Sequence, residues 1–195
     1  MILLKTIGKE LSYTEIIKKS KFLTFLHPVS NIDQAKLLLN QYKKKYGDAT
    51  HICYAYILDE NTFKYYDDGE PTSSAGIPMY QALKNNNIIY TLAVVIRYFG
   101  GTKLGVGGLT RAYSNGILML LSNKENVVDY KKYDEYIIEV PYSIFDNFLY
   151  HINNKGIAIN DKQFLDNVFI SLNLDDDTLF ELKELFPNLD FILSK

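Results

Sequence analysis

The chain of 195 residues is predicted to fold as an α+β protein with two domains. Strand-like segments rich in β-branched and aromatic residues alternate with helical ones along its length. The two halves also differ in charge, and the second half has a regular order of elements. At 47% hydrophobic and 23% charged residues, the chain can bury a proper core and is not disordered.

The first half is predicted to form a sheet with helices packed on one face. It opens with a pair of strands separated by the polar stretch Lys18-Lys19-Ser20. Ser30 or Asn31 is then expected to cap a helix that Gly47 ends. The strands of this half are expected at 12–17, 21–28, 51–58, 63–66 and 92–96, the last a continuous apolar run typical of a buried strand. Further helices are expected between the loop 67–71 and residue 85, with Pro78 in the first turn, and over 109–121.

The second half has the order βαββαβ. Strands are expected at 136–140, 156–164, 168–174 and 190–193. Ser143 is expected to cap the first helix, and Asp175–Asp177 to begin the second, where acidic residues suit the positive end of the helix dipole. This order over about sixty residues is that of the ferredoxin-like split βαβ unit.

The boundary is placed in the polar stretch 122–134, which gives domains of residues 1–128 and 129–195. The first carries 15 Lys and Arg against 10 Asp and Glu, and the second carries 6 against 13. Such a split can indicate that one part faces nucleic acid. The alternative is that two small domains simply differ in charge.

The chain is expected to be cytoplasmic, without a membrane partner. Its start, MILLKTIG, is too soon interrupted for a signal peptide, and the apolar run 88–96 is too short to span a bilayer. A single cysteine, Cys53, excludes an internal disulfide and favours a reducing compartment.

The stretch 97–113, RYFGGTKLGVGGLTRAY, is the main candidate site. Five glycines lie among Arg97, Lys103 and Arg111, between a predicted strand and a predicted helix. Free N–H groups at the positive end of a helix can hold an anion such as a phosphate. The standard nucleotide-binding motifs GxxxxGK[ST] and GxGxxG are absent. The alternative is that the glycines only form tight turns and allow the helix to pack.

The acidic loop DDGEP allows two interpretations. Asp67, Asp68 and Glu70 offer oxygen ligands suited to Mg²⁺, but adjacent residues on one turn rarely share an ion. The alternative is a solvated turn, or carboxylates that pair with Arg97 or Arg111. We therefore assign no metal and no cofactor.

Catalytic chemistry finds little support in the sequence. The three histidines are scattered, and Cys53 is expected to be a buried, inert residue of a strand. We assign no catalytic residue.

The two motifs together resemble a known family. DDGEPTSSAGIP followed by AVVIRYFGGTKLGVGGLTRAY is similar to the paired signature of the IMPACT/YigZ family, and EIIKKSKFLTFLHPV and HICYAY extend the likeness. The resemblance implies an N-terminal domain similar in fold to the second domain of a small-subunit ribosomal protein. It also implies a C-terminal domain similar to ferredoxin-like domains of elongation factor G, and an association with translation.

The resemblance marks specific residues as the family's signature. They are Asp67, Asp68, Gly69, Glu70 and Pro71, and then Arg97, Tyr98, Gly100, Gly101, Leu104, Gly105, Gly107, Gly108, Leu109 and Arg111. One position departs from the pattern, because Ser73 stands where the family usually has glycine. This departure puts in question a close backbone approach at Ser73.

These observations leave three hypotheses. The leading one is a translation-associated regulatory protein that binds RNA or the ribosome through a basic, glycine-rich corner. The residues assigned to this contact are Arg97, Tyr98, Gly100, Gly101, Lys103, Gly105, Gly107, Gly108 and Arg111. The alternatives are an enzyme acting on an anionic small molecule held between the acidic loop and the arginines, and a module whose acidic C-terminal domain docks on a basic partner.

Overall fold

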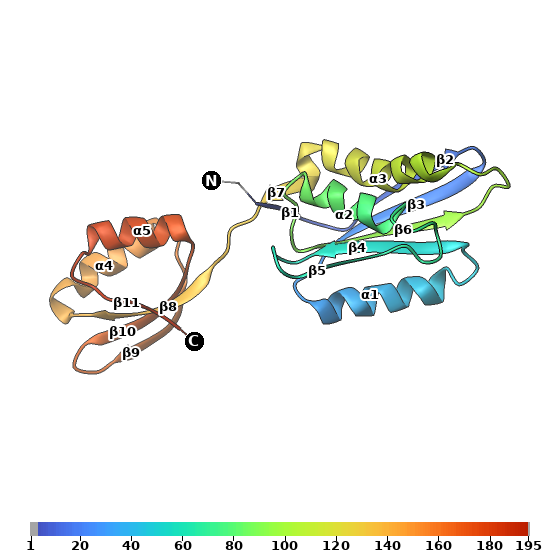
Figure 1. The fold of residues 1–195 in the computed structure, drawn as a ribbon. Helices are drawn as coiled ribbons and strands as arrows, with labels where there is room; N and C mark the ends of the chain where they lie inside the picture. Colours follow the sequence, from blue (N-terminus) through green and yellow to red (C-terminus); the bar gives the residue numbers. More distant parts are fainter. Residues whose placement is uncertain (1–3, 195) are drawn as a thin grey trace. The chain divides into compact units, whose positions relative to one another are not determined.

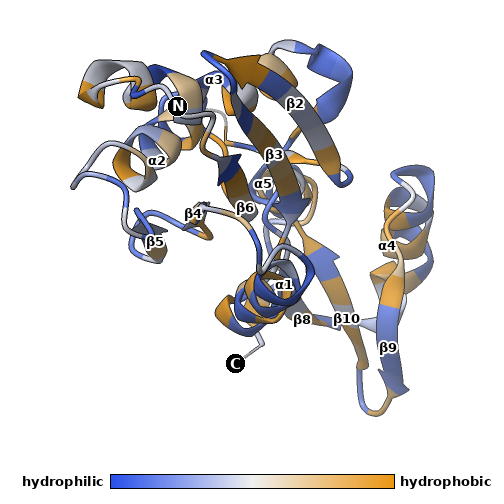
Figure 2. Cartoon of the chain, turned by 90° about the vertical axis from the view of Figure 1, so that its right-hand side faces the viewer, coloured by the Kyte–Doolittle hydropathy of each residue, from blue (hydrophilic) through white to orange (hydrophobic). Residues whose placement is uncertain are grey.

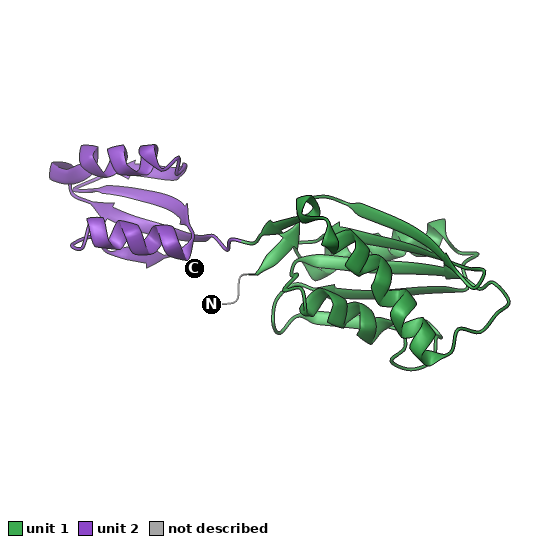
Figure 3. Cartoon of the chain, turned by 90° about the horizontal axis from the view of Figure 1, so that it is seen from above, with its two compact units in different colours: residues 1–130 green, residues 131–195 purple. Residues whose placement is uncertain are grey.

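The computed structural model describes residues 4–194, which divide into two compact units at residues 130 and 131 (Figure 3). Each unit has its own sheet and its own hydrophobic core. Within the described range, no helix is both long enough and apolar enough to cross a membrane.

The first unit is built on a five-stranded antiparallel sheet. Its strands, in spatial order, are β2 (Leu11–Ile17), β3 (Ser20–Pro28), β6 (Thr91–Tyr98), β4 (His51–Ile57) and β5 (Phe63–Tyr66). A separate two-stranded ribbon pairs β1 (Lys5–Ile7) with β7 (Val127–Asp129), just after the short 3₁₀ turn η1 (Lys124–Asn126). Sequence reasoning missed both ribbon strands, because three residues are too few to show a period.

Helices cover both faces of this sheet, so the expectation of helices on one face is wrong (Figure 1). One face packs against α1 (Ile32–Lys45), and the other against α2 (Gly76–Lys84) and α3 (Val106–Ser122). Strand β6 is buried along Thr91–Arg97 because alternate residues enter the two cores. The prediction of a buried strand at 92–96 is confirmed, and its unbroken apolar run is the pattern of a strand in a sheet covered on both faces.

Helix ends follow local chemistry in most places. The side chain of Asn31 accepts the N–H of Gln34 and caps α1, as expected. Figure 2 shows α1 with both hydrophobic and hydrophilic residues, consistent with a helix buried on one side. Helix α3, however, begins at Val106, three residues before the predicted start, so the end of the glycine stretch is helical.

The second unit has the predicted order β8 (Asp134–Val140), α4 (Tyr142–Asn154), β9 (Ile159–Phe164), β10 (Val168–Leu174), α5 (Asp176–Leu185) and β11 (Phe191–Leu193). The strands form one antiparallel sheet in the order β11-β8-β10-β9, which is the ferredoxin-like arrangement.

The two helices of this unit begin differently. Ser143 lies inside α4, whose first residue follows Pro141, and no side chain caps it; the prediction of a Ser143 cap is wrong. Asp175 does cap α5 by accepting the N–H of Thr178. This hydrogen bond, together with the ammonium of Lys131 2.9 Å away, lowers the pKa of Asp175 to about 2.

Candidate nucleic-acid interface

The turn between β2 and β3 carries two exposed lysines. Ile17 pairs with Ser20, so Lys18 and Lys19 alone make the turn, with φ values of 46° and 67°. Two consecutive positive φ angles are those of a type I′ turn, which usually contains Asn and Gly. Lysine has no conformational advantage at either position, so the turn is not formed by the residue types that favour it.

The glycine stretch lies directly against this turn. A Cβ atom on Gly100 would be 2.0 Å from the carbonyl carbon of Lys19 and 2.4 Å from the backbone nitrogen of Ser20. The N–H of Gly100 donates to the hydroxyl of Ser20 at 3.1 Å. Only glycine allows this approach, which holds the loop beside the two lysines.

The start of α3 is open to an anion. Gly105 precedes the helix with φ +76°, a conformation that favours glycine, and no side chain caps the first turn. No acidic residue lies in that turn, which includes Gly107 and Gly108. The first N–H groups of a helix have no partner within it and lie at its positive end.

Cations surround this helix start. Lys103 and Arg111 are exposed, as is Gly101 in the loop between the strand and the helix. We call Lys18, Lys19, Lys103 and Arg111 the basic corner. None of these four forms an ion pair with a residue in the range 4–194.

A cleft of about 370 Å³ lies between α3 and the β2–β3 turn. Lys18, Arg111 and Asn115 contribute polar groups to its lining, and Ile17 and Leu104 contribute apolar ones. Two cations beside an apolar wall can accept a phosphate and a flat ring at once. The cleft is lined by none of Asp67, Glu70 and Arg97, which the enzyme hypothesis requires to share one pocket with Arg111.

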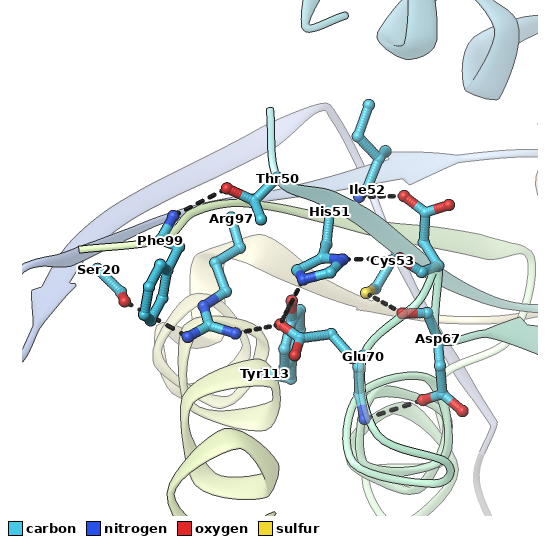
Figure 4. Close-up of polar contacts among 12 residues, drawn as sticks. Ser20, Thr50, His51, Ile52, Cys53, Asp67, Glu70, Arg97, Phe99 and Tyr113 are labelled. Atoms are coloured by element: carbon cyan, nitrogen blue, oxygen red, sulfur yellow. Dashed lines mark hydrogen bonds and ion pairs between the residues drawn. The ribbon is translucent and has the colours of Figure 1, made fainter. Parts of the chain in front are cut away.

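Arg97 does not belong to the surface, contrary to expectation. Its side chain is 5% exposed and donates from Nη1 to Oε1 of Glu70, itself 3% exposed, at 2.5 Å. Arg97 pairs with Phe22 of β3 and with His51 of β4, and Phe22 lies in the core on the α2–α3 side, so Arg97 is on that side of the sheet. Figure 4 shows the side chains of Arg97 and His51 directed toward Glu70. Pairing of a carboxylate of the acidic loop with Arg97 was one of the interpretations that the sequence allowed, and it is the one found in the structure.

Glu70 is the centre of a buried polar network. Oε1 also accepts the hydroxyl of Tyr113 on α3 at 2.7 Å, and lies 3.8 Å from Nε2 of His51 (Figure 4). His51 Nδ1 donates to the carbonyl oxygen of Asp68 at 2.7 Å. Burial raises the pKa of Tyr113, with further increases from Cys53 and Glu70, so its hydroxyl stays a donor. The network therefore ties the acidic loop to β4, β6 and α3.

Aromatic rings close the remaining sides of Arg97. The guanidinium carbon is 5.5 Å from the ring centre of Phe22 and 5.4 Å from that of Phe99. Nη2 donates to the Ser20 hydroxyl at 3.5 Å, whereas the buried Nε has no hydrogen-bond partner among residues 4–194. Tyr98 is half-buried, and its hydroxyl donates to Asp48 at 3.0 Å.

The other acids of the loop have structural partners as well. Asp67 accepts the N–H groups of Ser73, Ala75 and Gly76 and so caps the start of α2. Asp68 accepts the N–H of Ile52 at 2.7 Å. Within the described range, no group of three or more His, Cys, Asp or Glu is arranged to hold a metal ion. The carboxylates of the acidic loop therefore form hydrogen bonds that connect it to other parts of the first unit.

The departure at Ser73 coincides with an unusual backbone. Ser73 has φ +63°, in the left-handed region that favours glycine. Its side chain is exposed, and its N–H donates to Asp67 at 2.9 Å. The turn therefore keeps its hydrogen bond at this position despite a residue less suited to it.

Cys53 is fully buried, as predicted, and its thiol donates to the carbonyl oxygen of Asp67 at 3.0 Å. Burial raises the pKa of this thiol, and nearby carboxylates add to the effect. Because the thiolate is the reactive form, we expect labelling of native protein by a thiol reagent to be at least 100-fold slower than labelling in urea. Rapid labelling without denaturant would contradict the structure here.

Sequence reasoning missed Lys18 and Lys19 as site residues. Their signal was present, since two lysines between two strand-like segments must lie at a hairpin turn. What the sequence did not show is that the glycine stretch, 80 residues later, packs on that turn.

Comparisons with known proteins agree with the signature motifs. A family model described as the Impact N-terminal domain matches residues 18–121. The IMPACT family member YvyE of Bacillus subtilis is 38% identical over 173 residues, which cover 87% of this chain and 76% of that protein. YigZ of Escherichia coli is 38% identical over 107 residues, covering 53% of this chain and 52% of its own length.

The fold of both units is also found in a solved structure. A crystal structure described only as that of "an hypothetical protein" is similar over 100% of this chain and 98% of its own, with a TM-score of 0.69 and 25% identity.

Proposed function

Because this chain belongs to the IMPACT family, we propose that it is a cytoplasmic, translation-associated regulatory protein whose first unit binds RNA, free or on the ribosome. The observation that carries the proposal is the basic corner. Lys18 and Arg111 line one cleft at the open start of α3. Lys19 follows Lys18 in the chain, and Lys103 precedes Leu104, another residue that lines the cleft.

The cations of this corner suit phosphates better than carboxylates. A carboxylate is bound best by the planar guanidinium of arginine through two hydrogen bonds, and only one of the four cations is an arginine. Three of the four cations are lysines, which act as mobile point charges and suit backbone phosphates. The unpaired N–H groups at the start of α3 add a fixed positive dipole. Phe99, 46% exposed and next to Gly100 in the chain, offers a ring on which a base can stack.

The test uses salt dependence of binding to a single-stranded oligouridylate. Lys18→Asn with Lys19→Gly removes two charges while installing the residues that a type I′ turn prefers, so the fold should be at least as stable. We expect the slope of log K against log salt to fall by about 1.4, since each phosphate contact contributes about 0.7 on a single strand. Lys103→Ala and Arg111→Ala should each lower it by about 0.7.

The matched control removes two exposed lysines elsewhere in the first unit. Lys64→Ala with Lys124→Ala changes the net charge equally but leaves the corner intact. This variant should keep a slope near the wild-type value. If both double variants change the slope equally, binding reflects total charge and the corner is not the site. If the variants of the basic corner are folded and bind RNA as wild type does, the basic corner is not an RNA site and the glycine stretch has only a structural role.

A further inference from the structure

The sheet of the second unit has one face without a helix. Figure 1 shows α4 and α5 on a single face, and the inward residues of β8 and β10 form the core with them. Along β8, Ile138 and Val140 are buried, whereas the alternating residues Glu135, Ile137 and Glu139 are exposed. The second face therefore consists of side chains that no helix of this unit covers.

This face has an apolar centre. Ile137 pairs with Ile192 of β11, and Phe169 of β10 lies opposite Glu139. Ile137 is 39% exposed and Ile192 is 59% exposed, while Phe169 is half-buried. Apolar side chains gathered on an open sheet face are the usual mark of a contact surface.

Carboxylates surround that centre. Glu135 and Glu139 come from β8, and Asp161 comes from β9, opposite Ser171 of β10. None of the three forms an ion pair within residues 4–194. We call Glu135, Ile137, Glu139, Asp161, Phe169 and Ile192 the acidic sheet face.

Neutral donors hold these carboxylates in place. Ser171 and Asn160 donate to Glu135, Asn167 donates to Glu139 at 2.8 Å, and Gln163 donates to Asp161 at 3.0 Å. The bonds from Ser171 and Asn160 lower the pKa of Glu135. These hydrogen bonds hold the three carboxylates in fixed positions on the face, which is the pre-organisation that a cationic partner needs.

We propose that the acidic sheet face binds a basic segment of a partner protein, with lysine or arginine residues flanking one or two apolar side chains. The cations would meet Glu135, Glu139 and Asp161, and the apolar residues would cover Ile137 and Ile192. Residues 131–195 carry 12 Asp and Glu against 6 Lys and Arg, so the field of the whole unit attracts such a partner and repels nucleic acid. The inference is independent of the RNA site proposed for the first unit.

The test is NMR titration of the ¹⁵N-labelled full chain with a short peptide of alternating lysine and isoleucine, flanked by glycines. We expect amide shifts on β8, β10 and β11. Glu135→Gln, Glu139→Gln and Asp161→Asn together should weaken binding about tenfold at low salt. The control is Asp146→Asn on α4 with Asp177→Asn and Glu184→Gln on α5, three exposed acids of the helical layer whose loss changes the net charge equally.

Two further arms distinguish the alternatives. A peptide with serine in place of isoleucine should bind more weakly to wild type, because the apolar centre is then left uncovered. Oligouridylate should leave the amides of β8 and β10 unshifted. The proposal is overturned if the control variant loses as much affinity as the face variant, if the peptide shifts other elements instead, or if RNA shifts this face.

Discussion

Replacing Glu70 with glutamine should lower the free energy of unfolding of the first unit by about 3–5 kcal/mol. Glu70 and Arg97 are both almost fully buried, and their contact is 2.5 Å long. Glutamine keeps the shape and the acceptor for Tyr113 but leaves the guanidinium charge without a counter-charge. An unpaired charge in a buried site is among the most destabilising changes that one substitution can make.

Cys53 allows this prediction to be measured on the full chain. It is the single cysteine and lies in the core of the first unit, so its labelling in urea reports the unfolding of that unit alone. The midpoint for Glu70→Gln should fall by more than about 1 M. Asp33→Asn, which removes an exposed ion pair with Lys36 in the same unit, should cost at most about 1 kcal/mol.

A double variant separates the loss of the pair from the burial of one charge. Glu70→Gln with Arg97→Met removes both charges and should be more stable than Glu70→Gln alone. An equal or greater loss in the double variant would mean that the pair itself, rather than the uncompensated arginine, determines stability. A single variant as stable as wild type would contradict the buried position of Glu70.

Elements with a clear period or cap could be predicted from the sequence. The βαββαβ order of the second unit could be predicted, and so could the cap of α1, for which Asn31 was one of two candidates. The acidic run Asp175–Asp177 correctly predicted the start of α5, although the role of Asp175 as its cap was not predicted. Ser143 failed as a cap because the helix begins one residue before it, after Pro141. Pro141 has extended backbone angles and precedes the helix directly. Proline is also common in extended segments, so its presence in the sequence did not mark the helix start.

The candidate site was less predictable, because its pairings are distant in sequence. Arg97 meets Glu70 27 residues away, and Gly100 meets Ser20 80 residues away. Charge and glycine content marked the right stretch but did not distinguish a buried arginine from an exposed one. That distinction depends on the strand face, and Arg97 follows the alternation of Ala93 and Val95 into the α2–α3 core.

Replacing Gly100 with alanine should destabilise the first unit by about 1–3 kcal/mol or more. The added Cβ would lie 2.0 Å from the carbonyl carbon and 2.1 Å from the carbonyl oxygen of Lys19. These are backbone atoms of a tight turn, so they cannot rotate aside as a flexible side chain would. The loop must move away from the β2–β3 turn, which also breaks the hydrogen bond from Gly100 to Ser20.

Gly107→Ala is the matched control, because Gly107 lies in the first turn of α3 and no neighbour in the described part of the chain is within 4 Å of the added atom. Alanine favours a helix over glycine by about 1 kcal/mol, so this variant should be as stable as wild type or more so.

The comparison of the two glycine variants tests RNA binding as well as stability. If the basic corner binds RNA, Gly100→Ala should weaken binding even where the protein is still folded, because the loop that carries Lys103 is displaced from the β2–β3 turn that carries Lys18 and Lys19. Gly107→Ala keeps every cation in place and should bind as wild type does. Equal stability of the two variants would show that the glycine stretch does not pack on the turn.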